Sequence, residues 1–393
     1  MPAQPALIAA WARSAVAPHG GAFQALQAHQ IAAPVITALL QRAGLDAQAV
    51  DALVVGNALG AGGNPARMLA LAAGLPARCA AFSVDSQCCS GLDALALAVG
   101  LLASGQAAVV VAGGVEAWSR APIRQHRPLN AGEPAVPYER PAFAPDPARD
   151  PDLLQSAADY AAQQGITRAE QDAYAAQSHQ RAVQLAAQLA DEIVTVAGLD
   201  HDSYPRAMTA AKAARMPVAA RAQDLPPVPG RPLAMACAVS NLAISTRADG
   251  AAFVLLATPQ ACRAMGLDAR LRWRASASVG GDSATPLLLA EQAALAVMAR
   301  AGLPSMDALH AIELHDAFAV QGLHFCRALG LEPARINRRG GGLARGHPIG
   351  ASGAIALVRL LADLQRDGLA GDCGLAAIAG AGGIGAAAIV ERL

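Results

Sequence analysis

The chain has 393 residues, and its 30 basic side chains are balanced by 30 acidic ones, so the formal net charge is zero. This balance gives no long-range attraction to nucleic acid or to an anionic membrane surface, which excludes binding by net charge. Hydrophobic residues make up 54% of the chain and charged residues 15%, a composition that predicts a packed globular core of two or three structural units.

Two apolar stretches raise the question of export or membrane insertion. The first basic residue, Arg13, follows the amino-terminal apolar run, whereas a signal peptide places its charge before that run. Residues 94–115 are uncharged, but a Ser-Gly-Gln turn and a run of three valines predict a buried helix, a turn and a buried strand. The seven cysteines show no paired CxxC spacing, which indicates a reducing compartment. We therefore expect a cytoplasmic protein without membrane insertion.

The chain repeats itself at a spacing of about 260 residues, which indicates duplication of one structural unit. Residues 42–57 and 300–314 each predict the end of a helix, a short loop and a buried strand. Residues 90–114 and 352–383 each begin with Ser-Gly, continue as an apolar helix and end in a strand that closes with Gly-Gly.

Helices that alternate with short apolar strands predict sheets buried on both faces. The fold class is therefore α/β, with two layered α/β/α units. Residues 119–248 are first rich in proline and then helical and polar, so we expect an excursion that caps the duplicated core. Residues 249–256 are expected to form a core strand that returns to the first half.

The first candidate site residue is Cys88, which lies beside Cys89 at a turn between a strand and a long apolar helix. Ser90 is a suitable N-cap for that helix. The helix dipole and the unpaired N–H groups favour a thiolate, which is the nucleophilic form of cysteine. A pair of small buried residues is the alternative, because free cysteine is often buried.

The second candidate is His347, which glycines flank on both sides in residues 340–353. These glycines let the backbone approach a ligand closely and place the ring at the start of the following helix. In the repeat, this segment occupies the place that Cys88 occupies in the first half, so we expect the two loops to face each other. A purely structural turn remains the alternative.

Two further segments carry weaker signals. His315 ends a predicted buried strand, at the edge where α/β sheets bind ligands, although a histidine of the core fits the pattern as well. Residues 380–385 are similar to a dinucleotide-binding loop, but they lie too close to Leu393 to open a βαβ unit. We therefore exclude dinucleotide binding by that loop.

Taken together, these segments resemble the thiolase family in order along nearly the whole chain. The similar segments are residues 12–16, 62–67, 84–92, 113–119, 165–172 and 340–353. The resemblance implies a five-layered α/β/α/β/α fold from two duplicated halves plus an inserted loop domain. It divides the chain into a first core half, 1–118, completed by about 249–268, a loop domain, 119–248, and a second core half, 269–393.

The resemblance also implies the chemistry. The expected substrates are acyl-CoA thioesters, no cofactor is expected to stay bound permanently, and a homodimer or homotetramer is the expected assembly. Cys88 matches the nucleophile that accepts the acyl group, and His347 matches the histidine that activates it. The backbone N–H groups of Cys88 and Ala381 would hold the oxyanion.

Contacts to coenzyme A are implied more loosely. Ser245 matches a serine near the pantetheine arm. Lys212 and Arg215 lie in the region of the loop domain that usually meets the CoA phosphates.

Departures from the family pattern concern the second half-reaction. Ala379 stands where the family has its second catalytic cysteine, the acid and base for the α-proton of a second acyl-CoA. The pair His315-Asp316 resembles the sterol-carrier-protein type of thiolase, but Ala317 follows where those enzymes have a cysteine. Because alanine cannot transfer a proton, we expect acyl transfer onto Cys88 to be intact and Claisen chemistry to be impaired.

Our preferred hypothesis is an acyl-CoA acyltransferase that passes an acyl group from Cys88 to CoA or another acceptor. The first alternative is a decarboxylating condensing enzyme, because Cys88, His315 and His347 form a Cys-His-His set similar to that of the β-ketoacyl synthases. The second is a non-catalytic thiolase-like subunit of a multienzyme complex. Degenerate loop motifs at 153–158 and 240–243 favour that second alternative, whereas the presence of Cys88 and His347 argues against it.

Overall fold

The computed structural model describes residues 5–222 and 234–393. Within them, the longer strands join in one 11-stranded sheet with the order β13-β14-β15-β12-β1-β11-β5-β3-β4, beside which β2 pairs with β11 and β8 with β1. The strands are β1 (Leu7–Ser14), β2 (Ala17–Pro18), β3 (Ala52–Gly56), β4 (Ala80–Val84), β5 (Val109–Ala117), β6 (Arg124–His126), β7 (Val136–Tyr138), β8 (Ile193–Val194), β9 (Val218–Ala220), β10 (Val239–Ser240), β11 (Ala248–Ala257), β12 (Leu271–Gly280), β13 (Leu309–His315), β14 (Cys373–Gly380) and β15 (Ile384–Arg392).

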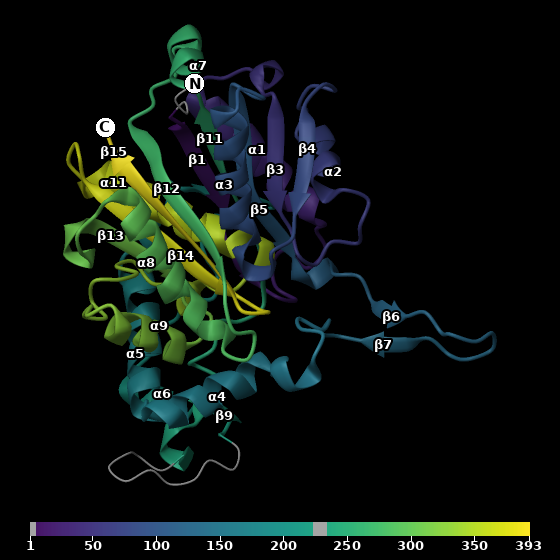
Figure 1. Ribbon diagram of the computed structural model, residues 1–393, viewed down its shortest axis with the longest axis vertical. Coiled ribbons are helices and arrows are strands. Elements are labelled where there is room, and N and C mark those ends of the chain that lie inside the picture. The colour runs from purple at the N-terminus through teal and green to yellow at the C-terminus, as the bar shows by residue number, and fades with distance from the viewer. Residues whose placement is uncertain (1–4, 223–233) are drawn as a thin grey trace.

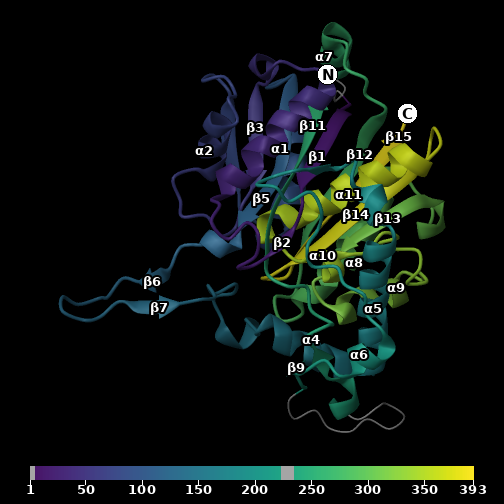
Figure 2. The same ribbon diagram turned by 180° about the vertical axis from the view of Figure 1, so that it is seen from behind.

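The helices arrange the sheet into layers, as Figures 1 and 2 show from opposite sides. They are α1 (Ala28–Ala43), α2 (Pro65–Ala72), α3 (Ser90–Ala103), α4 (Leu153–Gln164), α5 (Arg168–Gln184), α6 (Ala210–Ala214), α7 (Pro259–Met265), α8 (Leu289–Ala301), α9 (Ala319–Ala328), α10 (Gly342–Arg345) and α11 (Ser352–Asp367). Helices α1 and α2 cover the outer face of the first half of the sheet, and α8 covers the outer face of the second. Helices α3 and α11 pack together between the two halves. The expected five layers are confirmed.

The sequence repeat is a structural repeat. Helix α1 leads to β3 as α8 leads to β13, and α3 leads to β5 as α11 leads to β14. Gly44 and Gly302 end α1 and α8 in the left-handed conformation, with φ of 63° and 65°, which glycine adopts without a steric penalty. The strand ends differ from the expectation, because β5 continues past Gly113-Gly114 to Ala117, and β14 ends at Gly380.

The two halves are joined more closely than two separate units would be. Strand β11 returns from the insertion and lies between β1 and β5, which confirms the expected core strand. Strand β1 also pairs with β12, through Leu7 opposite Arg272 and Ile8 opposite Leu271, so one continuous sheet crosses both halves.

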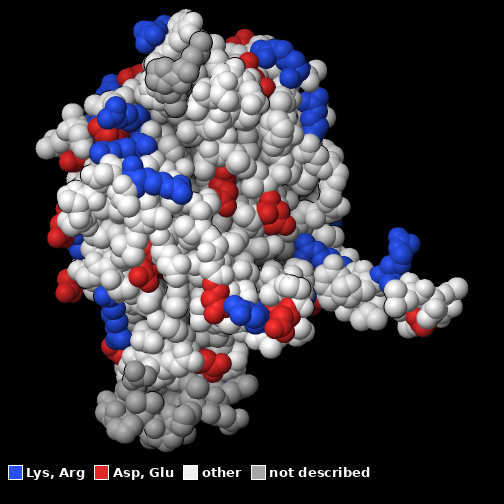
Figure 3. All heavy atoms as spheres, in the orientation of Figure 1, with Lys and Arg blue, Asp and Glu red and all other residues white. Residues whose placement is uncertain are grey.

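Much of the described part of the segment between β5 and β11 lies outside the layered core. Strands β6 and β7 form a hairpin that projects from the body, and α4, α5 and α6 lie below the second half of the sheet in Figure 1. None of the helices in the described residues is long and apolar enough to cross a membrane. Basic and acidic side chains are interspersed over the mostly uncharged face in Figure 3.

Candidate active site

Cys88 lies at a tight turn between β4 and α3. A short 3-10 helix, Gln87–Cys89, leads directly into α3. Gln87 adopts a left-handed φ of 53°, a conformation that costs a non-glycine residue about 1 kcal/mol and is typical of functional turns. The sequence predicts Ser90 as the N-cap of α3, but Ser90 is the first residue of that helix. Its hydroxyl instead binds the backbone N–H of Ser86 and the carbonyl of Gln87, so it closes the turn.

His347 faces Cys88, as the repeat predicts. Its Nε2 atom lies 3.2 Å from the Cys88 sulfur. The His347 backbone N–H donates to the carbonyl of Thr246 at 2.7 Å, which holds the loop against the start of β11. A nucleophile and a base from the two halves of the chain are thereby in contact.

Ser352 sets the tautomer of His347. Its hydroxyl donates to the carbonyl of Pro348 at 2.9 Å and lies 2.7 Å from Nδ1 of His347. Because the hydroxyl has one proton, it accepts from Nδ1–H, and Nε2 is left with a free lone pair toward Cys88. This tautomer is the one that can receive the thiol proton.

Both groups are neutral at neutral pH. Burial raises the pKa of Cys88 to about 11 and lowers the pKa of His347 to about 4. The expected effect of the helix start is therefore outweighed by burial, which disfavours charge. The pair is a thiol hydrogen-bonded to an imidazole, and not a preformed ion pair.

Two backbone N–H groups lie against the Cys88 sulfur, those of Ala381 and of Cys88 itself, and both lower the thiol pKa. Ala381 follows β14, and the turn that begins there continues through Gly382 and Gly383, both with positive φ. N–H groups from the two halves of the chain thus lie beside the same thiol.

A buried carboxylate connects the loop after β3 to the loop after His347. Glu116, on β5, accepts the backbone N–H of Ala58 and of Gly350 at 3.0 Å each and the side-chain amide of Asn57 at 2.8 Å. Beside Glu116, the backbone segments at Gly114 and Gly350 pass very close to each other. A Cβ added at Gly114 would lie 1.9 Å from the Gly350 carbonyl oxygen. Burial raises the pKa of Glu116 to about 7.

Cys88 and His347 open into a cavity of about 100 Å³. Ser245, whose hydroxyl donates to the Gly342 carbonyl at 2.7 Å, also lines it. The remaining lining residues are mostly apolar: Leu153, Ile244, Pro286, Leu287, Ala317, Phe318, Gln321, Ala379, Gly380 and Ala381. Among the described lining residues, Cys88 is the only thiol, because the neighbouring Cys89 points back toward the Ile378 carbonyl.

His315 lies behind His347 and does not line the cavity. The two imidazole rings stack with centroids 4.4 Å apart. His315 is buried, its Nε2 has no hydrogen-bond partner among the described residues, and burial, then His347 and Arg345, lower its pKa. Asp316 turns away from His315 and accepts the Tyr174 hydroxyl at 2.9 Å. Cys88, His347 and His315 therefore lie next to one another, but His347 separates His315 from the cavity.

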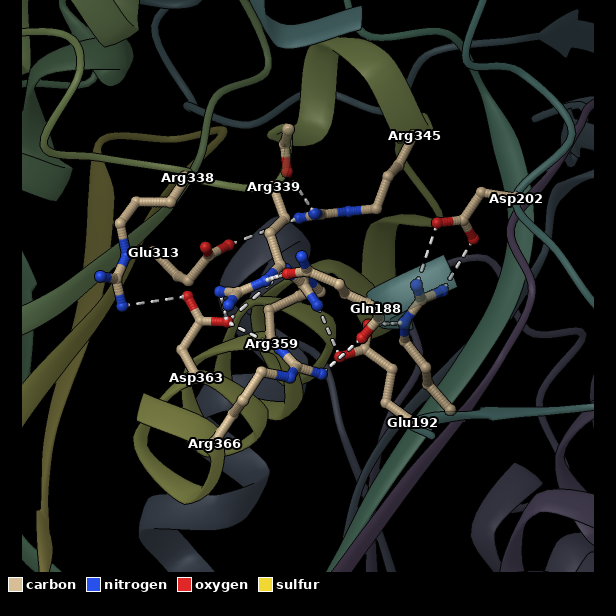
Figure 4. A network of polar contacts seen from close by, with 12 residues as sticks. Gln188, Glu192, Asp202, Glu313, Arg338, Arg339, Arg345, Arg359, Asp363 and Arg366 are labelled. Atoms are coloured by element: carbon tan, nitrogen blue, oxygen red, sulfur yellow. Dashed lines mark hydrogen bonds and ion pairs between the residues drawn. The ribbon is translucent and has the colours of Figure 1, made fainter. Parts of the chain in front are cut away.

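Next to the two histidines lies a buried network of ion pairs, shown in Figure 4. Arg359, on α11, donates to Glu192 at 2.6 Å, and Glu192 also accepts from Arg13 on β1 at 2.7 Å. Arg345, two residues before His347, lies 3.9 Å from Glu313, two residues before His315. The network ties both histidine segments to β1 and to the insertion.

Lys212 and Arg215, the remaining predicted residues, lie on and just after α6 in the insertion. Both side chains are exposed, and neither is among the described residues that line the cavity. The sequence reasoning missed Glu116 and Ser352 as parts of the site. For Ser352, its position at the start of a helix, five residues after His347, is a signal in the sequence. For Glu116, the sequence gives no comparable signal.

Comparison with known proteins shows the family of the chain. The models of the thiolase N-terminal domain and the thiolase C-terminal domain match residues 6–260 and 268–392. The acetyl-CoA acetyltransferases of Pseudomonas aeruginosa and Rhizobium meliloti are each 35% identical to the chain; the first match covers 99% of this chain and 100% of the relative, the second 98% of each.

Solved structures give the same result. The Bacillus anthracis acetyl-CoA acetyltransferase has a TM-score of 0.88 at 29% identity and covers 100% of both chains. The Acat5 thiolase from Ascaris suum in complex with coenzyme A has a TM-score of 0.86 at 25% identity, covering 99% of this chain and 100% of that one.

Proposed function

The chain belongs to the thiolase family and is a thiolase-type acyl-CoA acyltransferase, and we propose that it carries the acyl group on Cys88 and passes it to CoA or another acceptor. The observation that carries this proposal is the 3.2 Å contact between Cys88 and His347 at the wall of the cavity. No permanently bound cofactor takes part, because a thiol, an imidazole and backbone N–H groups suffice for acyl transfer.

The transfer proceeds as follows. The Cys88 thiol gives its proton to Nε2 of His347 while the sulfur attacks the thioester carbon of the acyl-CoA. The N–H groups of Cys88 and Ala381 bind the oxyanion, each contributing about 3 kcal/mol. The bond from carbon to the CoA sulfur then breaks, and the leaving thiolate takes the proton back from His347. Two easier steps replace one direct exchange.

Claisen condensation with a second acyl-CoA is slow in this proposal. Ala379 and Ala317 occupy the wall positions at which thiolases of the two types have a cysteine, and neither can take up the α-proton. His347 is the remaining base, and it is already engaged with Cys88. His315 lies outside the cavity wall, so decarboxylative condensation has less support than acyl transfer.

Ser245 is proposed to meet the pantetheine arm, and Lys212 and Arg215 to meet the CoA phosphates. Ser245 lines the cavity beside His347, which supports the first contact. Exposed basic side chains on α6 are suited to bind phosphate from solvent.

We further propose that the protein works in the cytoplasm as a homodimer or homotetramer. All seven cysteines are free, which suits a reducing compartment. Met68, Leu71 and Phe82 are about half exposed on the neighbouring elements α2 and β4, at the edge of the sheet. Light scattering after size exclusion, with Phe82→Asp as the variant, tests the assembly; a monomeric parent protein would contradict it.

Mass spectrometry of the intact protein tests the proposed chemistry. The protein is incubated with acetyl-CoA, malonyl-CoA and longer acyl-CoAs, and the modified peptide is mapped. We expect a thioester on Cys88 that Cys88→Ala abolishes and Cys89→Ala retains. No adduct with any acyl-CoA would favour the non-catalytic subunit, and loss of CO₂ from malonyl-CoA would favour the condensing enzyme.

A further inference from the structure

Three side chains outside the active site form a continuous hydrogen-bonded chain across three helices. Nε2 of His324, on α9, lies 2.8 Å from the Glu291 carboxylate on α8, and Nδ1 lies 2.6 Å from the Tyr160 hydroxyl on α4. A carboxylate can only accept, so the imidazole proton lies on Nε2, and Tyr160 donates to Nδ1. The Tyr160 and His324 rings also meet edge to face, with centroids 5.3 Å apart. We call these three residues the helix clasp.

The helix clasp is partly buried, and Tyr160 is suited to act as its hydrogen-bond donor. The side chains of His324 and Glu291 are 19% and 21% exposed. Burial, and secondarily Glu291, raises the pKa of Tyr160, so the phenol keeps the proton that it donates. Such a chain of polar groups polarises along its length, because Glu291 favours the tautomer that accepts from Tyr160.

Each of the three helices begins at the cavity of Cys88. Leu153 is the first residue of α4, Phe318 is the residue before α9, and Leu287 belongs to the short 3-10 helix that leads into α8. All three side chains line the cavity. The walls opposite Cys88 are thus the ends of the helices that the clasp joins.

Each helix links one clasp residue to one residue of the cavity wall, so the hydrogen bonds of the clasp restrict the position of that wall residue. Tyr160 lies seven residues after Leu153, which is about 10 Å along α4. On α8, Glu291 lies within about two turns of Leu287, and on α9, His324 lies within about two turns of Phe318. The clasp therefore fixes the spacing of the walls without touching the acyl group, and its residues are positioning residues.

The cavity itself admits little. Its volume is about 100 Å³, and its walls are mostly apolar side chains. No lysine or arginine lies among the described lining residues, so a distal carboxylate would find no cation. A wider spacing of the walls would give a longer chain more room.

We propose that Tyr160, His324 and Glu291 restrict the acyl group on Cys88 to a short apolar chain by holding three walls of the cavity at a fixed spacing. This inference rests on the proposed function, since it requires that Cys88 carry an acyl group. A longer acyl group would have to separate α4, α8 and α9, and the hydrogen bonds of the clasp resist that separation.

Tyr160→Phe tests the inference, because it removes one hydroxyl and keeps the ring. Rates of Cys88 acylation by acetyl-CoA and octanoyl-CoA are measured by mass spectrometry of the intact protein. The ratio of the octanoyl rate to the acetyl rate should rise about three- to tenfold, the effect of one net hydrogen bond. Tyr138→Phe, on the projecting hairpin, is the matched control and should leave the ratio unchanged.

A second pair of variants checks the other end of the clasp. Glu291→Ala should raise the ratio, and Glu291→Gln, which can still accept from Nε2–H, should restore most of the restriction. Unchanged ratios in Tyr160→Phe and Glu291→Ala, or equal losses with both substrates, would overturn the inference and leave the clasp a structural contact only. A parent protein that is acylated equally fast by both substrates overturns it while the proposed function stands; a parent that none acylates overturns both.

Discussion

The proposed reacting pair, Cys88 and His347, is a neutral thiol and a neutral imidazole, and this decides how the site should respond to mutation. Burial raises the pKa of Cys88 to about 11 and lowers that of His347 to about 4. The thiol therefore cannot rely on spontaneous ionisation near pH 7, when only a minute fraction is thiolate. In the proposed mechanism the proton leaves as the sulfur attacks, and His347 is in place to receive it.

His347→Ala should therefore slow acylation of Cys88 by about 10²-fold or more at neutral pH. The measurement is the rate of thioester formation from acetyl-CoA. Because His347 gains a proton only near pH 4, loss of the base should appear in the pH profile of the parent protein only as the pH approaches that value. The exposed His201 provides a control, and His201→Ala should leave the rate unchanged. A parental rate in His347→Ala would make His347 structural.

Ala379 limits the chemistry that follows acylation. In deuterated water, the α-protons of acetyl-CoA should exchange slowly, because no thiol lies opposite Cys88 among the described residues of the cavity wall. Ala379→Cys should increase this exchange and the thiolysis of acetoacetyl-CoA together, by up to about 10²–10⁴-fold. Ala379→Ser, with a hydroxyl too weakly acidic to replace the thiol, is the matched control. No gain in Ala379→Cys would mean that the second half of the site has diverged beyond this residue.

At the scale of elements, the active site depends on how two loops are held against β5. Glu116 receives N–H groups from the loop after β3 and from the loop after His347, and it is 1% exposed. Its position affects the His347 loop, because Gly350, whose backbone N–H it accepts, is three residues from His347. A change at Glu116 should therefore act on catalysis without any contact to substrate.

Glu116→Gln should reduce acylation at least tenfold, because an amide NH₂ cannot accept the N–H groups that one carboxylate oxygen accepts. Since burial raises the pKa of Glu116 to about 7, the parental rate should fall as the pH drops through 7, when protonation removes acceptor capacity. The variant should lack that step. The exposed Glu133 gives the control, Glu133→Gln. A step at pH 7 that persists in Glu116→Gln would assign it to another group.

Some features of the fold and of the site could be predicted from the sequence, and others could not. The repeat predicted α1 with β3 and α8 with β13, and the apolar segment 249–256 predicted the returning strand β11, because repeats and apolar runs are visible in the sequence itself. It also predicted that the Cys88 and His347 loops face each other. The roles of Glu116 and Ser352 could not be predicted, because tertiary packing places their partners, which are mainly backbone N–H groups for Glu116 and the His347 ring for Ser352. Ser90 was wrongly expected to be an N-cap, because the 3-10 turn before α3 has no sequence signature.

At the scale of the whole molecule, buried ion pairs connect parts that are distant in sequence. Arg359, on α11 of the second half, shares Glu192 with Arg13, on β1 of the first half. Glu192 itself lies in the insertion, so one carboxylate joins all three parts of the chain. The division at 1–118, 119–248 and 269–393 stays a prediction, and this network with the β1 and β12 pairing implies that these parts unfold together.

Arg359→Met should therefore destabilise the entire protein by about 3–5 kcal/mol, because it leaves the buried carboxylates of the network one cation short. Although burial alone would raise it, Arg359 and then Arg13 lower the pKa of Glu192, so this stabilisation is present at neutral pH and is lost on acidification. The measurement is urea unfolding, followed by fluorescence of the tryptophans, which lie in both halves. Arg78→Met, at an ion pair whose arginine is 58% exposed, is the matched control and should cost at most about 1 kcal/mol. Two separate transitions, or equal effects of the two variants, would show that the network does not couple the parts of the chain.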